Sequence, residues 1–219
     1  MLSRRHTSDA TRIEVGVDEA GRGPMFGPVF AAAVVLPVDS PNFPYKDMKD
    51  SKRFHSKKKI KAVAQAIQEG ALAWSVVHRD HTYIDTHNIR AATHSAMHEA
   101  ITSVLKKLSP SEAPLLLIDG NDFTPLPWSC DGEIGFAPCV CLPKGDNKNV
   151  SIAAASILAK VWRDAHIAAL CEADPTLDER YGLAKNQGYG TAQHMAGLRQ
   201  HGLAEGHRRS FGLCAELSL

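Results

Sequence analysis

The sequence of 219 residues lacks the patterns that mark several common classes of protein. Its five cysteines include no C-x-x-C pair, which argues against a zinc site or a thiol redox centre. An odd number of cysteines, together with a first stretch that has no apolar leader, predicts reduced thiols and a cytoplasmic location. No apolar run approaches the roughly eighteen residues that a membrane span requires.

Neither sign of charge is in clear excess, because 25 Lys and Arg oppose 24 Asp and Glu. Any nucleic-acid surface must therefore be a local patch rather than a property of the whole chain. One stretch, residues 46–61, holds eight basic residues against two acids. Such a run is compatible with a nucleic-acid contact and with an ordinary solvated helix face.

Motifs for nucleotide cofactors and for nucleophilic catalysis are missing as well. The series Gly21, Gly23 and Gly27 has the spacing of neither a dinucleotide fingerprint nor a P-loop, and there is no G-x-S-x-G. His94 and His98 are four residues apart, but no third ligand accompanies them, which is typical of a polar helix face. Nucleotide cofactors and a nucleophilic serine are therefore not expected.

The most informative stretch present is residues 18–24, which follows an alternating apolar run at 13–17. Asp18 and Glu19 put two carboxylates at the end of a predicted strand, a costly arrangement unless a cation is bound there. Mg²⁺ and Mn²⁺ prefer such oxygen ligands. Glycines then let a ligand approach the main chain, and Arg22 offers a planar fork to phosphate or sugar oxygens. An anionic substrate and a divalent metal are indicated.

Strands and helices alternate along the chain, which predicts an α/β domain. Strands are expected at 13–19, 27–36, 71–77, 115–120 and 137–142. Helices are expected from Ser51 or Ser56 to 69, and at 88–108, 150–171 and 191–201. We divide the chain into a flexible N-terminal segment (1–12), a catalytic domain (13–172) and a small helical C-terminal appendage (173–219).

Further acids follow the predicted strands. Asp119 ends one apolar run and Asp146 follows another, so that with Asp18 and Glu19 four carboxylates gather at one edge of the sheet. This set suits two-metal hydrolysis of a phosphodiester. Asp164, within the helix predicted at 150–171, competes with Asp146 for the fourth position. We favour Asp146, because the glycine before it lets the backbone turn.

Two other classes of protein remain open at this point. A non-catalytic nucleic-acid-binding module would explain the basic stretch but not the acids, whereas a small-molecule phosphohydrolase would explain the acids but not the basic stretch. Metal-dependent cutting of a nucleic acid separates them.

Motifs occur in a fixed order along nearly the whole chain. They are GVDEAGRGP at 16–24, GPV at 27–29, DSK at 50–52, LIDGN at 117–121, KGD at 144–146, SIAAASILAKVWRD at 151–164, GYGT at 188–191 and HRRSF at 207–211. In this order they resemble ribonuclease HII, the prokaryotic type 2 ribonuclease H family. Type 1 ribonuclease H is disfavoured, because the matched motifs belong to type 2.

The resemblance implies a ribonuclease H-like fold, with a mixed β-sheet flanked by helices. It implies an endoribonuclease that hydrolyses the RNA strand of RNA–DNA hybrids and nicks DNA on the 5′ side of embedded ribonucleotides. A two-metal mechanism with Mg²⁺ or Mn²⁺ would leave 5′-phosphate and 3′-hydroxyl ends. The implied catalytic and metal-binding acids are Asp18, Glu19, Asp119 and Asp146.

The resemblance also implies how the substrate is bound. Gly21, Arg22 and Gly23 would read the 2′-hydroxyl, which a closely approaching backbone can sense because that group both donates and accepts. Tyr189 would stack on the adjoining deoxyribose or base step. The implied phosphate contacts are Lys52, Lys144, Lys160 and Arg163, whereas Arg208 and Arg209 either bind phosphate or anchor the C-terminal tail.

Some features depart from the family pattern or leave its details open. Asn186 and Gln187 stand where His-Lys is expected, which would weaken one phosphate contact. Successive strand side chains point to opposite faces, so Glu19 can join Asp18 only if the strand twists or ends there. We expect a monomer. Residues 215–219 have a faint resemblance to tails that bind sliding clamps, and a frayed terminus is the alternative that we favour.

Overall fold

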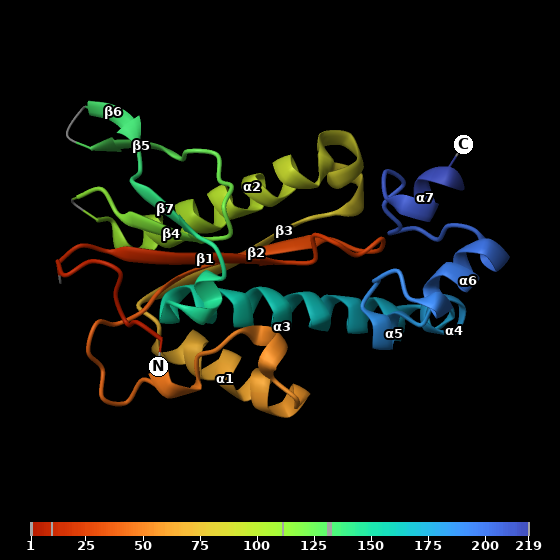
Figure 1. Ribbon diagram of the computed structural model, residues 1–219, viewed down its shortest axis with the longest axis horizontal. Coiled ribbons are helices and arrows are strands. Elements are labelled where there is room, and N and C mark those ends of the chain that lie inside the picture. The colour runs from red at the N-terminus through yellow and green to blue at the C-terminus, as the bar shows by residue number, and fades with distance from the viewer. Residues whose placement is uncertain (1, 10, 111, 131–132, 219) are drawn as a thin grey trace.

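A five-stranded mixed sheet forms the centre of the protein (Figure 1). The computed structural model describes residues 2–9, 11–110, 112–130 and 133–218. In spatial order the strands are β3 (Ala73–Arg79), β2 (Val29–Val35), β1 (Glu14–Ala20), β4 (Leu115–Asp119) and β7 (Cys139–Leu142). The first three pair antiparallel, and β4 is parallel to both β1 and β7. The predicted mixed sheet is confirmed.

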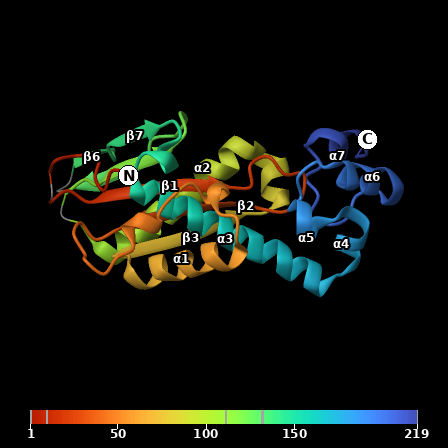
Figure 2. The same cartoon turned by 60° about the horizontal axis from the view of Figure 1, so that its bottom comes forward.

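Helices cover both faces of this sheet, as the two ribbon views agree (Figures 1 and 2). On one face lie α1 (Lys57–Gly70) and α3 (Val150–Ala173), and on the other lies α2 (His81–Leu108). Alternation along β1 directs Val15 and Val17 toward α2. Between them, a Cβ on Gly16 would lie 2.2 Å from the backbone carbon of Ser151, so glycine lets α3 pack directly against the strand.

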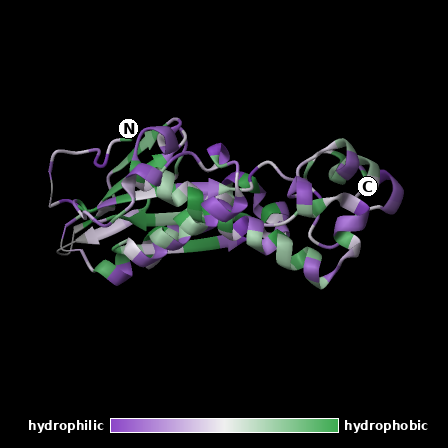
Figure 3. Cartoon of the chain, turned by 90° about the horizontal axis from the view of Figure 1, so that it is seen from below, coloured by the Kyte–Doolittle hydropathy of each residue, from purple (hydrophilic) through white to green (hydrophobic). Residues whose placement is uncertain are grey.

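The C-terminal unit is helical and lies at the far end of α3 (Figure 1). Its helices are α4 (Thr176–Tyr181), α5 (Leu183–Asn186), α6 (Ala192–His201) and α7 (Gly212–Glu216). Its small core includes Phe26, from the loop that follows β1, and Ile167, from α3. Figure 3 shows that the central strands carry mostly apolar or neutral residues, whereas the helices carry both kinds. The C-terminal unit therefore shares its core with the segment after β1.

Several element boundaries differ from those predicted. The helix expected at Asn88 begins earlier, at His81, after a cap in which Asp80 accepts from the Tyr83 N–H at 2.8 Å. At Asn88 the helix is interrupted by a backbone φ of 66°, and the Asn88 side chain accepts from the Ala91 N–H at 3.0 Å. Asn88 is thus a cap, as predicted, but a further helical segment precedes it.

Other differences arise at short elements. Ser56 caps α1, whereas Ser51 begins a 3-10 helix, η2 (Ser51–Arg53). A two-stranded hairpin, β5 (Pro127–Cys130) with β6 (Glu133–Phe136), was not predicted. Two more 3-10 helices, η1 (Tyr45–Asp47) and η3 (Gly145–Asn147), complete the described elements. In the described part of the chain, no helix has both the length and the apolar character that a bilayer crossing needs.

The N-terminal segment, which we predicted to be flexible, is hydrogen-bonded to the catalytic domain. Ser3 donates its N–H to the Lys148 carbonyl at 2.8 Å and accepts from the Val150 N–H at 3.0 Å. The N–H groups of His6 and Thr7 donate to a buried carboxylate, that of Glu14. The segment therefore lies against the turn that precedes α3.

Two histidines in the C-terminal unit form a buried pair. Their Nε2 atoms, in His194 and His207, are 3.0 Å apart. His194 Nδ1 lies 3.0 Å from the Tyr189 carbonyl, to which it can only donate, so His194 accepts at Nε2 from His207. The Ala204 N–H donates to His207 Nδ1 at 3.0 Å. Burial lowers the pKa of His207 to about 4.

Acid is expected to destabilise the protein through His207. The unfolded chain protonates this imidazole near its ordinary pKa of 6.5, whereas the folded protein resists protonation down to about 4. Stability is therefore retained above pH 6.5 and lost as the pH falls, by about 2 kcal/mol at pH 5. Urea unfolding at pH 7 and pH 5 measures this loss. His207→Gln should reduce it, whereas His201→Gln, at an exposed histidine, should not.

Candidate active site

A cleft of about 480 Å³ opens where β1 ends, between the sheet and the C-terminal unit. Of the residues predicted for the site, the cleft is lined by Asp18, Glu19, Gly21, Arg22, Gly23, Lys52, Asp119, Asp146, Lys160, Arg163 and Tyr189. Lys144 is the exception, and it lies in the left-handed region (φ 56°) just before η3. Acids from separate segments of the chain thus face one cavity together with the glycine-rich loop.

The register of β1 and β4 brings Asp18 and Asp119 together. Val17 of β1 is paired with Ile118 of β4, so the next residues, Asp18 and Asp119, occupy neighbouring strands at the same level. Asp18 is only 5% exposed, and its carboxylate accepts from the Glu19 N–H at 2.7 Å. Burial, followed by the charges of Glu19 and Asp119, raises the pKa of Asp18 well above its usual range.

Asp146 joins this group through the turn after β7. The Gly145 N–H donates to Asp119 Oδ1 at 2.6 Å, which holds η3 against the end of β4. Burial, then the charges of Asp119 and Asp50, raises the pKa of the Asp146 carboxyl. Asp119 therefore acts electrostatically on Asp146 as it does on Asp18.

Glu19 also faces the cleft, although it directly follows Asp18 in β1. The strand ends one residue later, at Ala20, and the Glu19 carboxylate lies 3.4 Å from the Arg22 guanidinium. Burial raises the pKa of Glu19 even though Arg22 opposes the shift. The conflict expected from strict strand alternation is thus relieved where the strand ends.

Asp164, the alternative fourth acid, also lines the cleft, but it has a different partner. It forms an ion pair with Lys160, one helical turn earlier on α3, with the Lys160 Nζ 2.9 Å from Oδ2. Spacing of i, i+4 on a helix favours such a pair. Lys160, predicted as a phosphate contact, is thus within reach of both Asp164 and the cleft.

Arg163 lines the cleft but is almost wholly buried, packed beneath the glycine-rich loop. It is 2% exposed and donates to the carbonyls of Pro28 at 3.3 Å and Gln187 at 2.8 Å. Gly21 has a φ of 94°, and a Cβ there would lie 2.2 Å from Arg163 Nε. The predicted phosphate contact therefore donates to the main chain, and its bulk explains why residue 21 has no side chain.

Sequence reasoning missed several residues that line the cleft. Ser51 and Ser156 lie on facing elements with their hydroxyl oxygens 3.1 Å apart, but a serine alone carries no sequence signal. Lys185, which is exposed, lies beside the two positions that depart from the family pattern. Of these, Asn186 donates to the Tyr181 carbonyl at 2.6 Å and accepts from the Gly188 N–H at 2.8 Å. Asn186 therefore orders the turn that leads to the exposed Tyr189.

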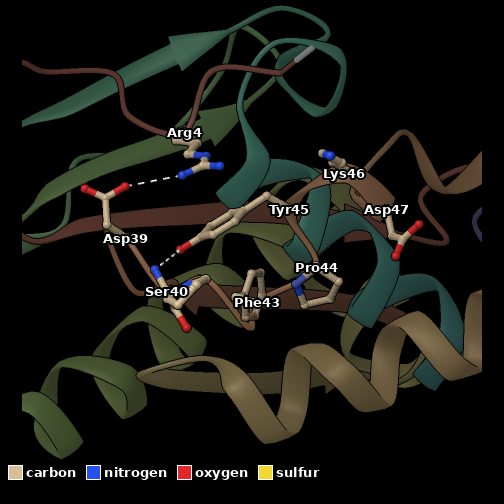
Figure 4. A pocket seen from close by; sticks show the side chains of 9 residues that line it. Arg4, Asp39, Ser40, Phe43, Pro44, Tyr45, Lys46 and Asp47 are labelled. Atoms are coloured by element: carbon tan, nitrogen blue, oxygen red, sulfur yellow. Dashed lines mark hydrogen bonds and ion pairs between the residues drawn. The ribbon is translucent and has the colours of Figure 1, made fainter.

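A second hollow, of about 530 Å³, shares no lining residue with the carboxylate cleft (Figure 4). Its centre is Tyr45, whose hydroxyl donates to the Pro37 carbonyl at 2.6 Å. The Arg4 guanidinium lies 4.4 Å from the centre of the Tyr45 ring and 3.3 Å from Asp39. Arg4 and Asp39 thus pair with each other, and the hollow holds two acids against five in the cleft, so we assign the chemistry to the carboxylate cleft.

The carboxylate cleft fits divalent metal ions by the chemistry of its donors. Within the described residues, no three acidic, histidine or cysteine side chains are already converged on one point as a metal site. Instead, carboxylate oxygens accept from protein groups, as Asp119 does from Gly145 and Asp146 does from the Asn147 amide at 3.0 Å. Hard oxygens and mutual repulsion are the conditions under which Mg²⁺ or Mn²⁺ would bind.

This fold and this cleft define the class of protein: a metal-dependent hydrolase built on a mixed α/β sheet. The sequence model of ribonuclease HII matches residues 15–214. The chain therefore belongs to the ribonuclease HII family. As such it is a ribonuclease H that acts on RNA–DNA hybrids, which excludes a non-catalytic binding module and a small-molecule phosphohydrolase.

Known proteins resemble the chain over most of its length. Ribonuclease HII of Dechloromonas aromatica is 44% identical over 205 residues, which cover 93% of each chain. The RNase HII solved with PCNA from Archaeoglobus fulgidus has a TM-score of 0.65 at 22% identity, covering 91% of this chain and 95% of that one. Bst-RNase HIII in complex with Mn²⁺ has a TM-score of 0.60 at 22% identity, covering 88% and 71%. The two structures establish the shared fold.

Proposed function

We propose that this ribonuclease H cuts the RNA strand of hybrids and nicks DNA on the 5′ side of an embedded ribonucleotide, leaving 5′-phosphate and 3′-hydroxyl ends. One observation carries the proposal: five carboxylates, among them the four predicted acids, line a single cleft together with the glycine-rich loop at 21–23. A cluster of acids suits phosphodiester hydrolysis, and an adjacent exposed main chain suits recognition of one sugar hydroxyl.

The acids would hold two divalent ions, Mg²⁺ or Mn²⁺. Asp18 and Asp119, adjacent in the sheet, would face the scissile phosphate, with Asp146 completing the second site and Glu19 contributing from the strand end. Bound ions of this kind stabilise charge on the attacking and leaving oxygens. The protein's own part is to hold its carboxylates close together, at a cost that appears in the raised pKa values of Asp18 and Asp146.

The remaining residues would position the duplex. Gly21, Arg22 and Gly23 would read the 2′-hydroxyl, and Tyr189, 49% exposed at the rim, would stack on the adjoining step. Phosphates would be contacted by Lys52, Lys144, Lys160 and Lys185. Arg163 would act from beneath the loop, because its guanidinium donates to main-chain carbonyls.

One gel tests this proposal. We expect the protein to nick a DNA duplex that contains a single ribonucleotide, on its 5′ side, with Mg²⁺ or Mn²⁺ and not with EDTA. The same duplex without the ribonucleotide is the control and should stay intact. Folded protein that leaves the ribonucleotide duplex uncut under both metals would contradict the nicking activity, and cutting of a long hybrid only would restrict the function to hybrids.

Tyr189→Ala is expected to lower cleavage at a single ribonucleotide about 10- to 100-fold, because a stacked base or sugar step contributes on the order of 1–3 kcal/mol. Binding of the duplex should change much less, since phosphate contacts dominate affinity. Initial rates and fluorescence anisotropy measure the two effects. Tyr189→Phe keeps the ring and should retain most activity. Equal losses of cleavage and of binding in the alanine variant would refute the selective role.

Three further predictions concern partners, oligomeric state and location. We propose that the C-terminal tail contacts a sliding clamp, in view of the complex of PCNA with the archaeal relative. Leu217, after α7, is 43% exposed and available for such a contact, whereas Leu219 lies outside the described residues. The monomeric state and the cytoplasmic location stay predictions.

A further inference from the structure

Arg208 is an arginine without any exposed surface that binds the glycine-rich loop from the C-terminal unit. Its guanidinium donates to three main-chain carbonyls: Gly21 at 2.6 Å, Arg22 at 3.0 Å and Gly27 at 2.8 Å. The adjoining backbone pairs as well, because the Arg208 N–H donates to the Met25 carbonyl at 2.8 Å. One side chain thus fixes two successive peptide groups of the loop.

Peptide geometry determines the direction in which the N–H of each of these two peptide groups points. Both peptide bonds are trans, and in a planar trans peptide the N–H points opposite to the C=O. Since the carbonyls of Gly21 and Arg22 point at Arg208, the N–H groups of Arg22 and Gly23 point away from it. Within the described part of the chain, neither N–H has an acceptor in the protein. Both residues line the carboxylate cleft.

Arg208 keeps its positive charge although it is buried. Burial, then the nearby charge of Arg163, lowers the pKa of Arg208 to about 9, so the guanidinium stays protonated at neutral pH. The guanidinium of Arg208 lies over the aromatic ring of Phe211, with 5.0 Å between the guanidinium carbon and the ring centroid. A buried charge is retained only where its hydrogen bonds are satisfied, and here main-chain oxygens satisfy them. A lysine would keep the charge but not the planar fork that reaches three oxygens.

We infer that Arg208 is a positioning residue for sugar recognition: by holding the carbonyls of Gly21 and Arg22, it aims the N–H groups of Arg22 and Gly23 into the cleft as donors to the ribonucleotide. The inference rests on the proposed function, in which this loop reads the 2′-hydroxyl. It assigns to the C-terminal unit a part in specificity as well as in packing. Arg208 itself need not touch the substrate.

The test compares two charge-conserving changes in the C-terminal unit, Arg208→Lys and Arg199→Lys. Arg199 is exposed on α6 and does not line the cleft. Affinities are measured with Ca²⁺ in place of the catalytic metal, for a duplex with one ribonucleotide and for the same duplex of DNA only. Arg208→Lys should lose most of the preference for the ribonucleotide and lower kcat at that site about 100-fold. Affinity for the DNA duplex should stay within about twofold, and Arg199→Lys should match the wild type.

The ratio of the two affinities distinguishes positioning from mere support of the fold, because a smaller folded fraction would lower both equally. An unchanged ratio in folded Arg208→Lys overturns the inference. Should that variant not fold, Phe211→Leu, which removes the ring beside the guanidinium, decides: a reduced ratio supports the inference and an unchanged one overturns it. A wild type without any preference for the ribonucleotide would instead refute the proposed function.

Discussion

Asp18→Asn is expected to lower turnover by about 10³-fold or more while making the metal-free protein more stable. The amide keeps the oxygen that accepts from the Glu19 N–H but removes a buried charge that Glu19 and Asp119 repel. Removing such repulsion should raise the free energy of unfolding by about 1 kcal/mol or more, roughly 3 °C in the melting midpoint for a chain of this length.

The pH dependence of that gain has a definite sign. A carboxyl with a raised pKa in the folded state stabilises at low pH and loses this contribution as the pH rises through the folded value. Asp18→Asn should therefore gain more over the wild type at pH 7 than at pH 4. Thermal melts with EDTA measure this, and Mg²⁺ should then raise the midpoint of the wild type far more than that of the variant. Asp39→Asn, at an exposed acid, is the control, and a variant less stable than the wild type at pH 7 would contradict the repulsion.

Asp146→Asn should lower turnover by about 10²- to 10³-fold and raise the metal concentration needed for half-maximal rate. Asp164→Asn should mainly affect stability, by at most about 1 kcal/mol, because it removes one partly exposed ion pair with Lys160. The two substitutions are chemically identical and both positions line the cleft, so each serves as the control for the other.

Rates at several Mg²⁺ concentrations and melting midpoints distinguish the two acids. The assignment of Asp146 depends on its position beside Asp119, to which the preceding Gly145 is hydrogen-bonded. If Asp164→Asn abolishes cleavage while Asp146→Asn spares it, and both variants fold, the second ion is held from α3 instead.

Much of the sheet could be predicted from local patterns. The apolar runs that became β1, β2 and β4 have few other ways to bury their side chains, and the acids that end β1 and β4 are recognisable because charge interrupts each run. Parallel pairing of these two strands then brings Asp18 and Asp119 together. The hairpin of β5 and β6 gave no such signal, since its strands are four residues each and the first begins with a proline.

The roles of the buried arginines could not be predicted. An arginine is ordinarily an exposed side chain, so we predicted that Arg163 contacts phosphate. For Arg208 the sequence left two roles open, a phosphate contact or an anchor of the C-terminal tail. Their burial depends on carbonyls from the loop after β1, which are far away in the sequence. Whether they are buried depends on how the C-terminal unit packs onto that loop. No periodicity in the sequence of the unit or of the loop predicts this contact.

The helix α3 belongs to both halves of the molecule, which limits how the enzyme can be divided. Its first turns pack against β1 at Gly16, and its later residue Ile167 lies in the core of the C-terminal unit. The boundary that we drew after residue 172 falls at the last turn of this helix. A fragment that stops there would retain all four acids and lose Arg208 and Tyr189. With the roles proposed for Arg208 and Tyr189, exchange of C-terminal units between relatives would transplant part of the substrate selection, and a split enzyme would need both pieces to select the ribonucleotide.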